Sequence, residues 1–560
     1  MRARILVATL AAVASIGFST VAPAQLLADK VLVNGKIVTV DMAFAIREAI
    51  AIAGDRILAT GTSEAMRKLA KPDAQVVDLG GRTVIPGLTD SHMHAVRAAL
   101  TYSIEVNWTG LRSLNEGLAK IREAAAKAKP GQWIIVAGGW RDSQFSEGRK
   151  PTQAELIAAA PDHPVFVQHL YDWLILTPKG LDALGIKTES DLPRGGKLVM
   201  TGEGKPTGEI LGGALVYSIL FERLPRPTFV QEIEGTKQFF RELNRLGLTG
   251  LVDPAGVSVF PVNYRPINTL WRDKQLTMRV SYFISSQNRG KELEDYKNLL
   301  QLVPSNFGDD MLRFGGIGEI VTWGAWTNND ISPEVKKQLS DVLNWAADNR
   351  VNMQIHWNPN QTIRHLIDIV EDIGKRTSVR ELRWWVNHLH DATEENLKKL
   401  RDLGISWSVQ DSLYFSADQY KKIFGVEISR FSPPIVTAWK LGLHVAGGTD
   451  AHRVSSYNPF VALQWYLDGK AIDGKTITGE DERPTREQAL RMYTINSVWL
   501  VHQEDRRGSL EPGKYADLAV LTKDYLSVPI GEIASTESVL TMVGGKAVYA
   551  AGPFTAMEGK

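Results

Sequence analysis

The sequence predicts an α/β protein in which a (β/α)8 barrel adjoins a small β-domain built from both ends of the chain. Short strand-like runs with turns at Asn34-Gly35 and Gly54-Asp55 occupy residues 30–60, and runs of the same texture recur near the C-terminus. Between them, apolar β-branched runs alternate with amphipathic stretches, a pattern typical of a parallel sheet flanked by helices. Eight such runs are present, the number of strands that a (β/α)8 barrel needs.

The composition is that of a soluble globular protein. Hydrophobic residues make up 44% of the 560 residues and charged residues 23%, which excludes a polytopic membrane protein and a mostly disordered chain. The 64 Lys and Arg residues nearly balance the 63 Asp and Glu residues. Because this balance creates no bulk field, we expect a small-molecule substrate and no nucleic-acid partner, with homo-oligomer formation left open. The absence of cysteine excludes disulfides, thiolate metal sites and cysteine nucleophiles.

Residues 1–24 have the features of a signal peptide. Arg2 and Arg4 precede an uncharged apolar run over residues 5–18, and residues 22–24 form an A-x-A cleavage site. An uncleaved membrane anchor is the alternative, but the apolar run is short for a span of about 20 residues. We therefore expect a secreted or periplasmic protein with no stable membrane insertion after cleavage.

The predicted domains follow from the strand-like runs. The β-domain comprises residues 30–83 and 506–552, and the barrel comprises residues 84–505, beginning with the run TVIPGLTDSHMH. Residues 108–245 interrupt the alternation after this first strand and contain strand-like runs of their own, with many Gly and Pro residues. We expect them to form an insertion near the mouth of the barrel.

Four histidines and one aspartate are placed where barrel strands should end. His92 and His94 form an H-x-H pair, and residues i and i+2 of a strand point to the same face. His356, His388 and Asp450 each end a strand-like run. The C-terminal ends of barrel strands meet at one mouth, where imidazoles and a carboxylate suit Zn²⁺ or a similar divalent ion. Each residue alone is typical of an ordinary hydrogen-bonded side chain, so it is their joint placement that indicates a metal site.

Several motifs resemble those of the amidohydrolase superfamily of metal-dependent hydrolases. These are VNGKIVTVD and VVDLGGRTVIPGLTDSHMH near the start, and GSLEPGKYADLAVL near the end. GWRDSQFSEGRKPTQAELIAAAPDHPVF, KPTGEIL and ALRMYTINSVWL resemble more narrowly the branch that contains N-substituted formamide deformylase. The similarity runs from about residue 30 to residue 550. It implies a metal-bearing (β/α)8 barrel beside a small β-sandwich that both termini form.

The resemblance also implies roles for individual residues. The family's first-strand H-x-H matches His92 and His94, and its fifth-strand histidine matches His356. Its sixth-strand histidine matches His388, and its eighth-strand aspartate matches Asp450 in GGTDAH.

The fourth strand departs from the pattern of many relatives, which place there a carbamylated lysine that bridges two metal ions. The corresponding run is LRFGGIGEIVTW, and no lysine lies between Lys297 and Lys336. Gly318 falls near the position of that lysine, and Glu319 is adjacent. Two alternatives follow. Glu319 reaches the metal centre as the bridging ligand, or strand alternation turns Glu319 away and a single ion is held by fewer ligands.

Four further residues are candidate substrate contacts. Trp323 and Trp357 lie just past or at predicted strand ends and suit an apolar or aromatic pocket, although packing between barrel and helices is the alternative. His390 and His452 follow predicted ligands by two residues, so they either support those ligands, contact substrate or are merely exposed.

The favoured interpretation is a metal-dependent hydrolase that cleaves a C–N bond in an amide, formamide, carbamate or cyclic amide. One or two divalent ions, with Zn²⁺ as the best fit, would lower the pKa of a bound water toward about 7. Asp450 would act as the catalytic base and then protonate the leaving nitrogen. Two alternatives stay open: ester or lactone hydrolysis or deamination at the same site, and a non-catalytic periplasmic binding or regulatory protein.

Overall fold

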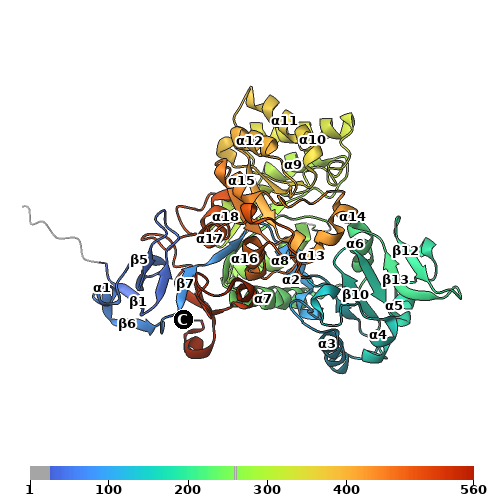
Figure 1. Ribbon diagram of the computed structural model, residues 1–560, viewed down its shortest axis with the longest axis horizontal. Helices are drawn as coiled ribbons and strands as arrows, with labels where there is room; N and C mark the ends of the chain where they lie inside the picture. Colours follow the sequence, from blue (N-terminus) through green and yellow to red (C-terminus); the bar gives the residue numbers. More distant parts are fainter. Residues whose placement is uncertain (1–25, 258, 260, 560) are drawn as a thin grey trace, which may run out of the picture.

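A computed structural model describes residues 26–257, 259 and 261–559 of the chain (Figure 1). The signal peptide expected over residues 1–24 lies outside the described residues. Within them, no helix combines the length and the apolar character that crossing a membrane requires.

The centre of the protein is a barrel of eight parallel strands. Four of them form the parallel part of one sheet, in the order β8-β14-β15-β17, and four form a second sheet, in the order β18-β19-β20-β21. The strands are β8 (Leu88–Asp90), β14 (Leu248–Asp253), β15 (Arg279–Ile284), β17 (Leu312–Ile317), β18 (Gln354–Trp357), β19 (Trp385–His388), β20 (Ser406–Gln410) and β21 (Val445–Gly448).

Backbone contacts join the two sheets into a closed barrel. A parallel bridge pairs Ile317, at the end of β17, with Met353, just before β18. On the other side, Ser91 N donates a hydrogen bond to Gly447 O over 3.0 Å, which links the end of β8 to β21. The alternation of strands and helices in the sequence therefore predicts the fold class correctly, and the (β/α)8 barrel is confirmed.

Helices cover the outside of the barrel, and α10 (Pro333–Asp348) shows how the sequence specifies them. The hydroxyl of Ser332 accepts a hydrogen bond from Val335 N and caps the helix, while Pro333 occupies the first turn, where the N–H that it lacks would have no helical partner. Its buried residues recur at intervals of three and four and form one apolar face toward the strands: Leu339, Val342, Leu343 and Ala346.

A β-sandwich built from both ends of the chain adjoins the barrel, on the left in Figure 1. One sheet has the order β5-β4-β1-β6 and the other the order β24-β23-β22-β7-β2-β3. The N-terminal strands are β1 (Ala28–Val33), β2 (Lys36–Val38), β3 (Ile46–Arg47), β4 (Ala49–Ala53), β5 (Arg56–Gly61), β6 (Ala70–Asp78) and β7 (Thr83–Pro86). The C-terminal strands are β22 (Leu518–Leu521), β23 (Ser538–Val543) and β24 (Lys546–Ala550). Leu32 and Ile50 from one end share a core with Leu518 and Leu540 from the other.

The segment between β8 and β14 contains a third structural unit, on the right in Figure 1. Its sheet has the order β12-β13-β11-β10-β9, and Trp108 and Trp140 lie in a core of its own. The strands are β9 (Ile134–Val136), β10 (Val165–His169), β11 (Trp173–Leu176), β12 (Lys197–Met200) and β13 (Pro206–Leu211). The helices are α3 (Leu114–Lys127), α4 (Gln153–Ala159), α5 (Pro178–Ala183) and α6 (Ala214–Glu222). We call this unit the insertion; the exact domain boundaries given above remain predictions.

Candidate metal centre

The ends of four barrel strands bring the predicted ligands together at one mouth. His92 and His94 follow β8, His356 lies in β18, His388 ends β19, and Asp450 follows β21 by two residues. The convergence is the one expected for the C-terminal ends of parallel barrel strands. All five side chains are buried or nearly so.

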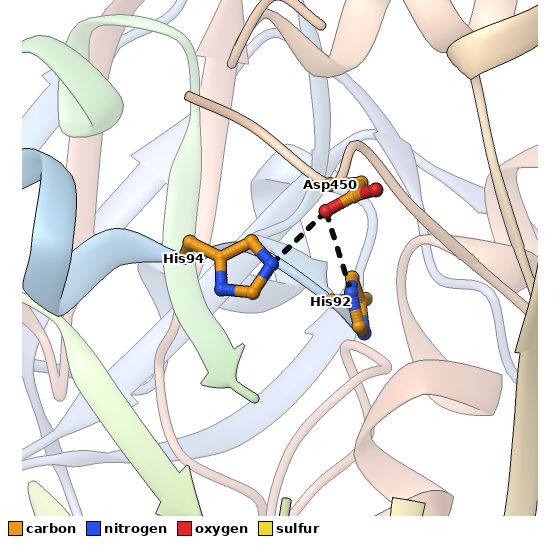
Figure 2. Close-up of side chains that lie close together, drawn as sticks. All are labelled: His92, His94 and Asp450. Atoms are coloured by element: carbon orange, nitrogen blue, oxygen red, sulfur yellow. Dashed lines mark ion pairs between the residues drawn. The ribbon is translucent and has the colours of Figure 1, made fainter. Parts of the chain in front are cut away.

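Backbone hydrogen bonds place the H-x-H segment beside Asp450. Asp450 N donates to His92 O over 2.8 Å, and His94 N donates to Ala451 O over 2.8 Å. Asp450 Oδ1 lies 3.5 Å from His92 Nε2 and 3.1 Å from His94 Nε2, so one carboxylate oxygen faces both imidazoles (Figure 2). Asp450 and His388 both have positive φ angles, +58° and +69°. Residues other than glycine hold such backbone conformations only where the surrounding structure enforces them.

Glu319 joins this cluster from the fourth barrel strand. Its Oε1 lies 3.3 Å from His94 Nε2, and its Oε2 lies 3.4 Å from His92 Nε2. The same Oε2 lies 3.1 Å from His356 Nδ1 and 3.6 Å from His388 Nε2. Glu319 thus lies between the two histidines of β8 and the two later histidines, which is the place of a bridging carboxylate.

The approach of Glu319 depends on how β17 ends. The strand stops at Ile317, after which Gly318 N donates to Ile284 O and Glu319 N donates to Pro254 O. A Cβ atom on Gly318 would lie 2.2 Å from Pro254 O, so this position needs glycine for close backbone contact. Because the chain has left the strand, strand alternation does not turn Glu319 away from the centre.

The cluster has the donor set and the orphaned atoms that a metal ion would require. His92 Nε2 and His388 Nε2 are buried and make no hydrogen bond within the described part of the chain. Donor atoms of His92, His94 and Asp450 lie within 4.8 Å of one another, as do those of His92, Glu319 and His388. Imidazole nitrogens and carboxylate oxygens at this spacing fit Zn²⁺ or a similar divalent ion.

The electrostatics of the cluster also favour a cation. Burial opposes the charged form of His92, but the nearby carboxylates of Asp450 and Glu319 outweigh it and raise the pKa of His92 to about 10. Burial and the neighbouring His356 lower the pKa of His388 to about 4. Burial opposes ionisation of Asp450, but the adjacent imidazoles of His92 and His94 outweigh it and hold the pKa of Asp450 below the usual range. The carboxylates of Glu319 and Asp450 are therefore both ionised within the buried cluster, where a bound cation would balance their charge.

Polar groups behind the histidines fix their orientation. Gln354 Oε1 lies 3.1 Å from His92 Nδ1, and Ala255 O lies 2.7 Å from His94 Nδ1. A carbonyl oxygen can only accept a hydrogen bond, so both rings carry hydrogen on Nδ1 and present Nε2 to the centre. The amide of Asn358 lies 2.9 Å from His356 Nε2, which leaves Nδ1 facing Glu319.

Asp253, at the end of β14, is a supporting residue that the sequence analysis missed. Its Oδ2 accepts a hydrogen bond from Val96 N over 2.7 Å, and its Oδ1 accepts one from Ala255 N over 3.0 Å. It thereby connects the helix that follows His94 to the loop whose carbonyl holds the His94 ring. The available signal was an aspartate closing the strand-like run GLTGLVD, the same pattern that singled out Asp450.

The cluster forms the floor of a cavity of about 650 Å³. The insertion contributes part of the walls, through Tyr171, Asp172, Lys197 and residues 211–216. Other walls come from the barrel and include Arg97, Val257, Trp326, Asn358 and Val454. The cavity provides room for a small molecule directly above the candidate metal centre.

The structure places both predicted substrate-binding tryptophans outside the wall of this cavity. Trp357 is fully buried, and its Nε1 donates to Thr362 Oγ1 over 3.2 Å. Trp323 donates from Nε1 to Ser286 O over 2.8 Å, and Arg289 lies over its ring. The expected contacts are corrected accordingly: among the described residues the tryptophan that lines the cavity is Trp326.

His390 and His452 also point away from the cavity. His390 is buried behind His388, with Nδ1 beside Tyr420 Oη and Nε2 2.8 Å from Gln410 O. His452 Nε2 lies 3.0 Å from Glu105 Oε2 in a buried contact with the segment that leads to the insertion. Both nitrogens of His390 and Nε2 of His452 face these partners, and neither residue is part of the cavity wall, so the structure favours supporting roles over the expected substrate contacts.

The fold and site define a metal-dependent hydrolase with a buried His, Asp and Glu centre. The profile of the amidohydrolase family matches residues 75–549, and the chain belongs to this family. It is 26% identical to N-substituted formamide deformylase of Arthrobacter pascens over 93% of this chain and 98% of that protein. It is 24% identical to the protein LONG AFTER FAR-RED 3 of Arabidopsis thaliana over 94% of this chain and 92% of that protein.

Two solved structures share the fold. A metal-dependent hydrolase of Pyrococcus horikoshii aligns with a TM-score of 0.64 and 20% identity over 90% of this chain and 99% of its own. The zinc complex of atrazine chlorohydrolase from Arthrobacter aurescens aligns with a TM-score of 0.52 and 16% identity over 93% of this chain and 95% of its own. At these identities the similarity shows that the fold is shared, and it concerns the fold alone.

Proposed function

We propose that the protein hydrolyses a C–N bond other than a peptide bond, in an amide, formamide, carbamate or cyclic amide. The observation that carries the proposal is the position of Asp450, whose Oδ1 faces both His92 and His94 at the base of an open cavity. A carboxylate held beside the expected metal can take a proton from water and give it to a leaving nitrogen. Similarity to N-substituted formamide deformylase over nearly the whole chain supports this choice of bond.

The metal would be held by the six side chains of the cluster. His92, His94 and Asp450 form one ligand group, His356 and His388 the other, and Glu319 lies within reach of both groups. Zn²⁺ suits this mixture of nitrogen and oxygen donors, and the arrangement allows one ion or two. When bound, a divalent cation lowers the pKa of water from 15.7 toward about 7 and polarises a carbonyl oxygen.

Proton transfer is the task of Asp450. Its pKa lies below the usual range because the adjacent imidazoles of His92 and His94 outweigh burial, so the carboxylate is ionised and able to accept a proton at neutral pH. The attacking water gives its proton to this carboxylate, which then protonates the nitrogen as the C–N bond breaks. Gln354 and Ala255 keep the neighbouring imidazoles oriented during both transfers.

A substrate panel with metal analysis tests the proposed function. Purified protein loaded with Zn²⁺ is assayed against N-formyl and N-acyl amines, carbamates and cyclic amides, beside esters, lactones and amino-substituted heterocycles, with bound metal counted in the same sample. We expect metal-dependent turnover of an amide or formamide. Preferred turnover of the esters, lactones or heterocycles would replace the proposal with those activities. Bound metal without turnover of any compound would favour the binding or regulatory protein.

We also propose that the protein is exported and acts on a small molecule outside the cytoplasm. The charge and apolar pattern of residues 1–24 supports export. The net charge of +1 offers no general attraction to nucleic acid. Sedimentation of the purified protein tests homo-oligomer formation.

A further inference from the structure

The walls of the cavity above the metal ligands are largely apolar. Leu211, Leu215 and Val216 face it from the insertion, and Val257 and Trp326 face it from the barrel. Such walls bury the hydrocarbon body of a ligand and leave orientation to the few polar groups among them. The charged residues of the walls therefore indicate which charged group the substrate has in addition to its hydrocarbon body.

Arg97 is a charged wall residue close to the centre. It lies in the first turn of helix α2 (Ala95–Thr101), which begins directly after His94. Arg97 and His94 both line the cavity, and the Arg97 side chain is half-buried. Burial and the charge of Arg97 oppose protonation of His94, although Glu319 and Asp450 outweigh them and raise the pKa of His94. The guanidinium is thus close enough to influence the ligand cluster.

Arg97 makes no hydrogen bond or ion pair within the described part of the chain. The other basic residues of the wall are Lys197, from β12 of the insertion, and Lys422. Lys422 lies 3.2 Å from Asp172, an acidic residue of the cavity wall. Lys197, in contrast, makes no ion pair with any described residue. Arg97 and Lys197 therefore face a largely apolar wall of the cavity, and neither forms an ion pair with another described residue.

We infer that Arg97, assisted by Lys197, binds an anionic group of the substrate, so that the enzyme acts on amides whose substituent carries a carboxylate. The inference rests on the proposed hydrolase function and specifies its substrate class. A half-buried guanidinium binds a carboxylate through two charge-assisted hydrogen bonds, while the apolar walls take the remaining hydrocarbon. The carboxylate of the substrate supplies the counter-charge that the protein does not.

A matched pair of substrates tests the inference. N-formyl-phenylalanine, in both enantiomers, and N-formyl-phenethylamine differ by one carboxylate; the N-acetyl pair is used if that acyl group gives the better turnover. We expect kcat/KM for the carboxylate form to exceed that for the neutral form by about 10-fold or more. Arg97→Met should raise KM for the carboxylate form by a similar factor and should affect kcat/KM for the neutral form much less. Arg97→Lys should restore part of the preference, and Lys197→Met should reduce it less than Arg97→Met.

Arg272→Met is the matched control, because it removes the same charge from an exposed residue at the end of α8 (Arg265–Arg272). Its substrate preference should equal that of the wild type. Equal turnover of both substrates by the wild type, or equal losses on both in Arg97→Met, would overturn the carboxylate subsite and leave the hydrolase function intact.

Binding of a non-substrate separates the subsite from catalysis. Calorimetry with 3-phenylpropionate and with the neutral 3-phenylpropanamide is performed on metal-loaded wild type and Arg97→Met. We expect the propionate to bind more tightly to the wild type, with this advantage lost in the variant. An advantage that persists in Arg97→Met would mean that the metal alone holds the carboxylate, and the inference would fail. If no amide is turned over in any assay, the proposed function fails while this binding result still decides the subsite.

Discussion

Asp253 holds the backbone N–H of Val96 at 2.7 Å and so fixes the start of the helix that follows His94. The same carboxylate accepts Ala255 N, and the Ala255 carbonyl in turn lies 2.7 Å from His94 Nδ1. The adjoining Pro254 carbonyl accepts Glu319 N. One loop after β14 thus determines where two candidate metal ligands stand, although it supplies no ligand itself.

Replacing Asp253 with Ala should therefore weaken metal binding. Loss of both hydrogen bonds frees the loop and the His94 ring, and loss of such supporting groups typically costs about 10- to 100-fold in metal affinity. Titration of metal-free protein with Zn²⁺ measures the change. Asp253→Asn retains one acceptor oxygen and should lie between Ala and wild type. Unchanged affinity in Asp253→Ala would show that the loop holds its position without the carboxylate.

Removal of a single imidazole should lower metal content and activity together. His92→Ala and His388→Ala each delete a buried nitrogen donor, and the chain has no cysteine to replace it. Elemental analysis beside turnover measures both effects in the same sample. His163→Ala provides a control, because this histidine lies in the insertion with Nδ1 2.8 Å from Gln132 O. Full metal occupancy with full activity in either ligand variant would contradict the assignment.

Asp450→Asn should retain part of the metal and lose most of the turnover. The amide keeps the shape of the carboxylate but cannot accept a proton, and general acid–base catalysis contributes typically about 10²- to 10⁴-fold in rate. The measurement is kcat of the metal-loaded variant on the best substrate of the panel. Turnover within a few-fold of wild type would remove Asp450 from proton transfer.

Glu319→Gln tests whether the centre holds one ion or two. A second cation close to the first requires an anionic bridge, and Glu319 lies 3.1 to 3.6 Å from all four histidines. We expect the wild type to bind two ions and the variant to bind one, as counted by elemental analysis after removal of loosely bound metal. One tightly bound ion in both proteins would establish a mononuclear centre.

The mature protein should begin near Gln25. Basic, apolar and small residues follow one another over residues 1–24 in the order that signal peptidases require. N-terminal sequencing of protein recovered from the periplasm or the medium measures the cleavage position. A mature chain that still contains Arg2 would contradict the prediction.

The sequence predicted the barrel and the convergence of the candidate ligands at one mouth, because both depend on short-range patterns. Strand alternation and the rule that parallel strands end at one mouth were sufficient to bring His356 and His388 together. The same alternation argues against Trp357 as a substrate contact, because neighbours in a strand face opposite sides and His356 already faces the centre. Glu319 was left undecided because the chain leaves β17 at Ile317, and this ending depends on contacts with Pro254 that no local pattern reveals.

An insertion near the barrel mouth was expected from the sequence, but the individual residues that it contributes to the cavity wall were not, for a different reason. Its sheet forms from runs that the sequence shows, but Lys197 reaches the mouth only because the insertion packs against the barrel, and the two units have separate cores. Contacts of this kind depend on surfaces far apart in sequence. The position of Asp253 at a strand end could have been predicted, since it closes a strand-like run. Its role could not, because its partner is a backbone N–H, which every residue except proline has.

The pairing of β22 with β7 has a consequence for the order of folding. Val84 and Ile85 lie beside Val520 and Ala519, residues from opposite ends of the chain. Because this pairing spans most of the chain, the loop that it closes is long and the sandwich forms late. A chain interrupted before β22 would leave β7 with an unpaired edge of apolar residues, a surface prone to aggregation and degradation. The sandwich can therefore form only after β22 has been synthesised, and an incomplete chain would expose the apolar edge of β7.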